Sequence, residues 1–154
     1  SALADGSHTV RVDASDYDGN AAAQKSVTFK IDTVPPTLSI TSPANGLVTN
    51  QAACTVAGKT NDATSSPVTV TVKLNSGAAE AVTVGSDGSF SKAITLAAGS
   101  NTITIVATDY AGKTTTVTRT VKLDTTPPTI KSVTLTPNPV DAGKTFIISV
   151  DVTD

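Results

Sequence analysis

The sequence is poor in the residues that mark many catalytic and disulfide-rich proteins. It has no tryptophan, no methionine, one cysteine (Cys54) and one histidine (His8), and aromatic residues make up 3% of its 154 residues. A single cysteine cannot form an intrachain disulfide, so a disulfide framework is excluded. A single histidine gives little support for a catalytic triad, which needs a histidine held between an acid and a nucleophile. We therefore expect no enzymatic centre in this chain.

Charge and hydrophobicity exclude two further classes. The net charge is −2 and charged residues make up 16% of the chain, so it lacks the basic surface that nucleic-acid-binding proteins use. No apolar run approaches the roughly 18 residues that a transmembrane helix needs. We predict neither a nucleic-acid partner nor a membrane span in this stretch.

Threonine is abundant, with 28 copies. Threonine and valine favour pleated, half-buried strands, and no segment shows a sustained helical period. The composition predicts an all-β chain.

One stretch of the sequence occurs twice. Residues 2–37 align with residues 95–129, first at an offset of 93 and then at an offset of 92, so the second copy has lost one residue after its D-Y-x-G turn. A repeat of about 90 residues is too long for a solenoid turn and suits a small β-sandwich. The matched pairs include Leu3 with Leu96, Asp16 with Asp109, Gly19 with Gly112, Asp32 with Asp124, and Pro35 with Pro127.

The double prolines set the borders of the repeating unit. With this phase, residues 1–34 are the C-terminal part of a preceding unit, residues 35–125 a complete domain, and residues 126–154 the N-terminal part of a following unit. Proline fixes φ and keeps the residue before it extended, so each linker is expected to be a stiff spacer. The chain is therefore expected to be a section of a tandem array.

Period-two alternation predicts the strands. It is clearest in residues 68–74, and in the first copy it predicts that Val10, Val12 and Ala14 line one buried face. Arg119 falls in phase with buried positions, and we expect it to be exposed, either through a bulge at the lost residue or at an edge position of the sheet. About seven antiparallel strands, separated by turns roughly every 8–12 residues, predict an immunoglobulin-like β-sandwich.

Three motifs carry a family resemblance. They are S-D-G-S-F at Ser86–Phe90, L-x-x-G-x-N-T-I-x-I-x-A-T-D-x-A-G at Leu96–Gly112, and D-T-T-P-P at Asp124–Pro128. With them the whole chain resembles the tandem bacterial immunoglobulin-like (Big-type) domain repeats of secreted and cell-surface proteins. The resemblance implies an extracellular bacterial location and neighbouring immunoglobulin-like repeats as partners. It implies a stalk of an adhesin or surface layer, or an accessory module beside a secreted glycosidase or protease.

Aspartates are expected to gather where one unit meets the next. In an antiparallel sandwich the loops after the second and sixth strands return to the entry pole, so Asp62 and Asp109 should lie near the linker residue Asp32. By the same logic, Asp124 should meet Asp154 at the next junction. Converging carboxylates can hold Ca²⁺, and the resemblance to adhesin arrays implies calcium at such junctions. The alternative is that each aspartate accepts backbone N–H bonds in its own turn.

Two smaller features have simpler interpretations. The run Asp16-x-Asp18-x-Asn20 is similar to the start of an EF-hand loop, but its glycine is misplaced and no bidentate glutamate follows, which favours an Asx turn. His8 aligns with Asn101, so this position does not require an imidazole. We interpret it as a polar residue at the start of a strand.

Two further expectations concern packing. Tyr17 and Tyr110 recur at the same turn and are expected to pack over the end of the hairpin. Cys54 is in phase with Val56 and is expected to be a small core residue.

The sequence favours a non-catalytic structural module, a spacer in a stalk of repeated immunoglobulin-like domains. The alternative is an adhesive or carbohydrate-binding accessory module of an adhesin or secreted hydrolase. The two copies differ mainly by conservative swaps in small polar turns, which favours the spacer. The partial units at each end leave strand edges unpaired, so another copy of the chain is a further expected partner.

Overall fold

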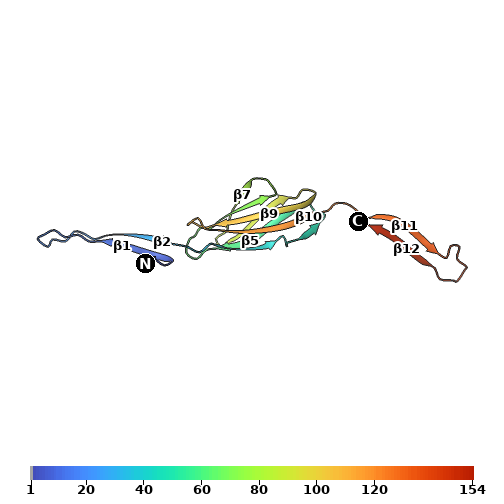
Figure 1. Cartoon of the computed structure of the whole chain (residues 1–154), viewed down its shortest axis with the longest axis horizontal. Helices are drawn as coiled ribbons and strands as arrows, with labels where there is room; N and C mark the ends of the chain where they lie inside the picture. The colour runs from blue at the N-terminus through green and yellow to red at the C-terminus, as the bar shows by residue number, and fades with distance from the viewer. Residues whose placement is uncertain (1) are drawn as a thin grey trace. The chain divides into compact units, whose positions relative to one another are not determined.

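The structure is all β. The computed structural model describes residues 2–154, and every helix-or-strand element in that range is a strand (Figure 1). None of the described residues forms a helix that could cross a membrane. The chain divides into two compact units, one ending at Leu123 and the other spanning Asp124–Asp154. The all-β prediction is confirmed.

The first unit begins with a two-stranded antiparallel hairpin of β1 (Gly6–Val12) and β2 (Lys25–Ile31). Its apolar side chains are exposed, Val10 by 48% and Val12 by 62%, and Ala14 beyond the strand is exposed as well. The prediction of a buried face here is wrong, because no second sheet of the described chain packs against this hairpin.

The rest of the first unit is a sandwich of two sheets (Figure 1). One sheet has three antiparallel strands in the order β3-β5-β8, and the other has five strands in the order β4-β10-β9-β6-β7. The predicted immunoglobulin-like sandwich is confirmed. The strands are β3 (Thr37–Ser42), β4 (Leu47–Thr49), β5 (Ala53–Asn61), β6 (Thr69–Leu74), β7 (Ala79–Val82), β8 (Ser89–Thr95), β9 (Gly99–Thr108) and β10 (Thr114–Leu123).

Strand β4 is an addition to the expected set. It pairs in parallel with the end of β10, with Leu47 opposite Val121 and Thr49 opposite Leu123. Its three residues are too few to show a period-two pattern. The sandwich therefore has eight strands rather than about seven, and one of its pairs is parallel.

The core lies between the two sheets. The central strand β9 supplies Ile103, Ile105 and Ala107, all fully buried, and Val56 of β5 belongs to the same buried cluster. Cys54 is partly buried and packs against this cluster, as expected. Because side chains alternate along a strand, each sheet turns one apolar face to the core and one threonine-rich face to solvent.

The two copies of the repeat fold with the same register. Gly6 pairs with Ile31 in the first hairpin, and Gly99 pairs with Leu123 in the second. The hairpin of β1 and β2 is therefore the structural counterpart of β9 and β10.

Arg119 differs from expectation. Strands β9 and β10 pair without a register shift, and Arg119 stays in phase opposite Ile103. Its side chain is half-buried, and its Nε is buried without a hydrogen-bond partner in the described chain. The irregularity lies in the first copy instead, where three residues (22–24) oppose two (13–14). Since β10 is continuous, Arg119 has no bulge through which to reach the surface, and the prediction that it is exposed is wrong.

The second unit is an antiparallel hairpin of β11 (Thr129–Thr136) and β12 (Ile147–Thr153). Its register shifts between Ile130 and Ser132, much as that of β3 and β5 shifts between Ile40 and Ser42. This hairpin therefore repeats the opening strand pair of the sandwich.

Candidate metal centre

Three aspartates from separate segments of the first unit lie together. Asp32 follows β2, Asp62 follows β5 and Asp109 follows β9, and one carboxylate oxygen from each lies within 4.8 Å of the other two. Asp62 and Asp109 are only 8% and 5% exposed, and Asp32 is half-buried. These are the residues expected to converge at the first junction, and the structure brings them together.

Hydrogen bonds join the segments that carry these aspartates. The Tyr110 N–H donates to Ser65 O (3.2 Å), which ties the loop after β9 to the loop after β5. Lys30 Nζ donates to Thr64 O (3.3 Å), which ties the end of β2 to the same loop. One main-chain and one side-chain hydrogen bond therefore join the segments that carry the aspartates.

The linker is fixed on both sides of its prolines. Asp32 Oδ1 accepts the N–H of Val34 (3.1 Å). Pro36 is fully buried, and its carbonyl accepts the Thr115 hydroxyl (2.6 Å). Because proline also fixes φ, the Asp32 carboxylate has a defined place at the entry to the sandwich.

Each of the three aspartates uses one oxygen in its own turn. Asp62 Oδ1 accepts two N–H groups of its loop (2.8 and 2.7 Å), and Asp109 Oδ1 accepts the N–H of Lys113 (2.9 Å). The Oδ2 atoms of Asp32 and Asp109 are buried and have no hydrogen-bond partner among the described residues. A turn role therefore leaves Oδ2 of Asp32 and of Asp109 without a partner in the described chain, so the turn interpretation does not account for these two oxygens.

This donor set suits a hard divalent cation. Unpartnered carboxylate oxygens are costly to bury, and like charges at this separation repel each other. Three carboxylates supply about three to six of the six to eight oxygens that Ca²⁺ takes, and water or carbonyl groups can supply the rest. The cluster offers neither thiolate nor imidazole, the ligands of most zinc and copper sites. The donor set therefore fits Ca²⁺, and by the same chemistry Mg²⁺ or Mn²⁺, rather than zinc or copper.

The second linker repeats the turn but shows no comparable cluster. Asp124 Oδ1 accepts the N–H of Thr126 (3.1 Å), as Asp32 accepts that of Val34. Asp154 is exposed. Residues 2–154 contain no second group of three acidic side chains of this kind, so the meeting of Asp124 with Asp154 stays a prediction.

The run from Asp16 to Asn20 forms a closed turn. Asp16 Oδ1 accepts the main-chain N–H of Asn20 and Asp16 Oδ2 accepts its side-chain Nδ2, both at 2.8 Å. The Asn20 side chain, followed by its main-chain N–H, lowers the pKa of Asp16. Both carboxylate oxygens are occupied, which agrees with an Asx turn.

Sequence reasoning missed the role of Asn101, which is fully buried. Its Oδ1 accepts the N–H of Ala97 (2.9 Å), and its Nδ2 donates to the carbonyls of Ala97 (2.7 Å) and Gly99 (3.1 Å). In the first copy, His8 Nε2 bonds the equivalent carbonyl of Ala4 at 2.7 Å. In both copies the side chain at this position therefore holds the preceding loop by hydrogen bonds. In the sequence, this shared role was indicated only by the alignment of His8 with Asn101.

The two tyrosines do not pack over the hairpin ends. Tyr17 is fully exposed and Tyr110 is 82% exposed. The expectation is wrong because the turn carries both rings past the last paired residues of the hairpin.

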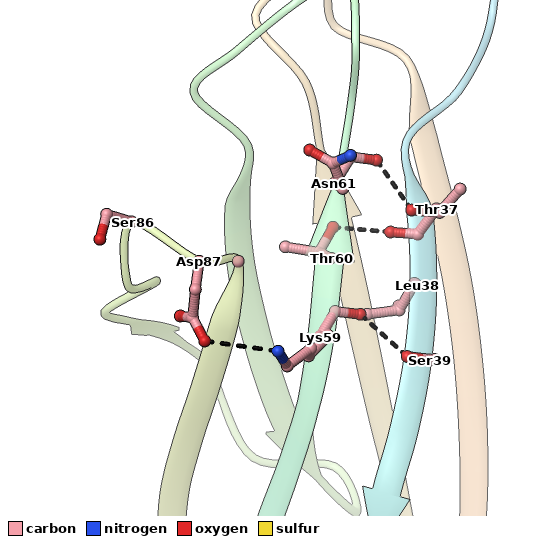
Figure 2. Close-up of a pocket in the computed structure, with 9 residues that line it drawn as sticks. Thr37, Leu38, Ser39, Lys59, Thr60, Asn61, Ser86 and Asp87 are labelled. Atoms are coloured by element: carbon pink, nitrogen blue, oxygen red, sulfur yellow. Dashed lines mark hydrogen bonds and ion pairs between the residues drawn. The ribbon is translucent and has the colours of Figure 1, made fainter.

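An open groove of about 390 Å³ lies over the ends of β3 and β5 and beside the turn before β8 (Figure 2). Figure 2 shows its polar groups bonded to one another: Lys59 Nζ pairs with Asp87 Oδ2 at 3.4 Å, and the Thr60 hydroxyl donates to Thr37 O at 2.7 Å. Lys59, Asp87 and Thr60 therefore already have partners within the protein.

Acid is expected to weaken the turn at Asp87. The Ser89 hydroxyl (2.6 Å), then the Ser89 N–H (3.1 Å) and Lys59, hold the pKa of Asp87 down to about 2, against an ordinary value of 3.8. A carboxylate with a lowered folded-state pKa stabilises the fold above its unfolded-state pKa, and this contribution is lost as the pH falls from about 4 to about 2. The melting temperature of Asp87→Asn should therefore fall less across this window than that of the wild type. Thermal melts at stepped pH check this, and equal slopes would contradict it.

The fold defines an immunoglobulin-like β-sandwich module with acidic loops beside its entry linker. The family model described as glucodextranase, domain B matches residues 36–125, more than half of the chain. The chain belongs to the glucodextranase domain B family.

A longer protein contains a similar stretch. Bacillopeptidase F of Bacillus subtilis (strain 168) is 33% identical over 111 residues, which is 72% of this chain and 7% of that protein. The chain thus spans a small fraction of the curated relative that it matches.

A solved structure shares the fold. A tetra-tandem repeat in the extending region of a large adhesion protein has 22% identity and a TM-score of 0.50, over 97% of this chain and 46% of that one. Fibronectin(III)-like modules of Clostridium thermocellum CbhA have 19% identity and a TM-score of 0.48, over 79% of this chain and 64% of that one. At this level of identity, the likeness to the adhesion protein shows the fold alone.

Proposed function

We propose that this chain is a section of a non-catalytic spacer, a stalk of repeated immunoglobulin-like domains in a secreted or cell-surface bacterial protein. In this proposal residues 35–125 are a complete domain, and residues 1–34 and 126–154 belong to its neighbours in the array. The repeated sequence, the double-proline linkers and the tandem bacterial immunoglobulin-like motifs support it. The partners are the adjacent repeats, and Ca²⁺ sits at their junctions.

The proposal rests mainly on the burial of Asp109 and on its carboxylate oxygen that has no hydrogen-bond partner. This residue is 5% exposed, and its buried Oδ2 has no partner in the described chain, while carboxylate oxygens of Asp32 and Asp62 lie within 4.8 Å of one of its own oxygens. Burial of an unpaired charged oxygen is unfavourable unless a cation or donor satisfies it. A calcium ion at this point would satisfy all three carboxylates.

Such an ion would stiffen the junction because its ligands come from both sides of it. Asp32 lies on the linker that enters the domain, whereas Asp62 and Asp109 lie on loops of the domain itself. A cation shared by these groups adds a fixed point beside Pro36, which is already buried. The linker would then resist bending, which is what a spacer requires.

Calcium is expected to protect the linker from proteolysis. Lys30 lies in β2, two residues before Asp32, so a lysine-specific protease can cut after it when the end of β2 opens together with the linker. At a calcium concentration ten times the dissociation constant, cleavage there should slow about tenfold, because binding to the closed form lowers the open population by that factor. EDTA should restore the original rate. Mass spectrometry of the fragments over time measures both rates.

The chain supplies matched controls for this experiment. Lys144 lies in an exposed loop of the second unit, and its cleavage should not respond to calcium. Asp109→Asn should abolish protection at Lys30, whereas Asp16→Asn should keep it, because both oxygens of Asp16 are occupied by Asn20. Protection that survives in Asp109→Asn, or that appears equally at Lys144, would refute the junction site.

The adhesive or carbohydrate-binding alternative has weaker support. In the groove at the ends of β3 and β5, Lys59 is paired with Asp87 and the Thr60 hydroxyl is bonded to Thr37 O. No tryptophan is available for sugar stacking. The spacer is therefore the function that the geometry supports best.

A further inference from the structure

Asp109 and its counterpart in the first copy, Asp16, lie in turns with the same main-chain pattern. In the second copy the Asp109 N–H donates to Lys113 O (3.1 Å), the Gly112 N–H donates to Asp109 O (3.2 Å), and the Lys113 N–H donates to Asp109 Oδ1 (2.9 Å). The corresponding three distances in the first copy are 3.0, 3.2 and 2.8 Å. The two turn glycines have matching φ angles of +83° and +87°. The turns therefore differ mainly in their side chains.

The two turns differ in whether their fifth residue, counted from the aspartate, donates a hydrogen bond to Oδ2 of that aspartate. In the first copy, Asn20 Nδ2 donates to Asp16 Oδ2 at 2.8 Å, so no oxygen of Asp16 is left over. In the second copy this position is Lys113, whose side chain is exposed, and Asp109 Oδ2 is buried without a partner among the described residues. The same backbone turn thus holds a carboxylate whose Oδ2 is hydrogen-bonded within the turn (closed) or one whose Oδ2 has no partner there (open).

We propose that the residue at position 113 determines whether this junction binds a divalent, oxygen-preferring cation. A lysine there leaves Asp109 Oδ2 open to the ion, whereas an asparagine closes the carboxylate against it. The inference rests on the proposed calcium junction and goes further, because it makes the junctions of one array unequal. A turn of the Asn20 type gives a weak junction, and a turn of the Lys113 type gives a strong one.

Two physical effects at this position have opposite signs, which makes the inference testable. Replacement of Lys113 by any neutral residue removes a positive charge near the cluster, and on Coulombic grounds this favours cation binding. An asparagine also adds a hydrogen bond that the ion must break to reach Asp109 Oδ2. Only the asparagine variant should therefore bind the ion more weakly than the wild type.

Isothermal titration of the whole chain with calcium chloride tests this in three proteins. Lys113→Asn is expected to bind Ca²⁺ on the order of tenfold more weakly than the wild type, the size of effect seen when groups around metal ligands are changed. Lys113→Ala, which keeps the main-chain N–H bond to Asp109, should bind at least as tightly as the wild type. In the absence of calcium, the side-chain amide of the new asparagine should give a slowly exchanging NMR signal pair.

The outcomes separate the two proposals. If the wild type binds calcium and both variants bind it equally well, the inference is wrong and the calcium junction stands. If both variants bind more weakly, the lysine itself assists binding and the inference is again wrong. If the wild type does not bind calcium at millimolar concentration, the calcium junction fails and the inference fails with it.

Discussion

Replacement of Asn101 by leucine is expected to lower the free energy of unfolding by about 3 kcal/mol. Leucine has nearly the shape of asparagine and would fill the same fully buried position, but it would remove the partner of the Ala97 N–H and of the carbonyls of Ala97 and Gly99. Each of these three hydrogen bonds contributes about 0.5–1.5 kcal/mol. For a domain of this size, the melting temperature should fall by about 12–24 °C. Circular dichroism at the β-sheet band during heating measures it.

A neighbouring residue gives the control for this experiment. Asn75 Nδ2 donates to Asn101 Oδ1 (3.1 Å) and Asn75 Oδ1 accepts the Thr102 N–H (2.8 Å), but Asn75 is exposed and has a φ of +52°. Asn75→Gly keeps this backbone conformation available and exposes the freed groups to water, so it should cost only about 1 kcal/mol. Equal losses in the two variants would show that burial of the Asn101 network is unimportant.

Asn101 also shows where sequence reasoning ended. The alternation along β9 places Asn101 in phase with the buried Ile103 and Ile105, but it does not show what the amide would bond. The hydrogen bonds of Asn101 depend on how the loop from Ala97 to Gly99 folds back over the strand end. This is a tertiary contact, and period-two patterning describes only the strand itself.

The strands were easier to predict, because their signal is local. The alternation in β6 and β9 sets which face is buried, and the structure places Val70, Val72, Ile103 and Ile105 in the core. The short parallel strand β4 had no such signal. The sequence shows that Arg119 is in phase with buried positions, and the lost residue predicts a bulge in the second copy. The structure has the irregularity in the first copy.

The convergence of Asp32, Asp62 and Asp109 could be expected from topology alone, since antiparallel connections return alternate loops to one pole. Topology did not predict which carboxylate oxygens are bonded within a turn and which have no partner in the described chain. For the turn aspartate this differs between the copies: Asn20 bonds Asp16 Oδ2, whereas Asp109 Oδ2, with Lys113 at the matching position, has no such partner. Atomic geometry was needed to see that one motif has two chemical states.

Replacement of Gly88 by alanine is expected to destabilise the sandwich by about 2–5 kcal/mol. Gly88 has a φ of +77°, which costs an alanine about 1–2 kcal/mol, and a Cβ there would lie 2.1 Å from the carbonyl oxygen of Thr60. That oxygen is main chain in a central strand, so relief of the overlap requires backbone movement, and overpacking of this kind costs about 1–3 kcal/mol more. Chemical denaturation of both proteins measures the difference.

The control is a glycine with the same conformation in open space. Gly46 has a φ of +78°, and a Cβ there would meet nothing within 4 Å. Gly46→Ala should therefore show only the conformational cost of about 1–2 kcal/mol.

The Gly88 carbonyl also accepts the N–H of Thr60 at 2.9 Å, two residues before Asp62. Gly88→Ala should therefore weaken calcium binding as well as the fold, while Gly46→Ala leaves calcium binding unchanged; equal stability losses in the two variants would rule out the contact with Thr60 as the cause.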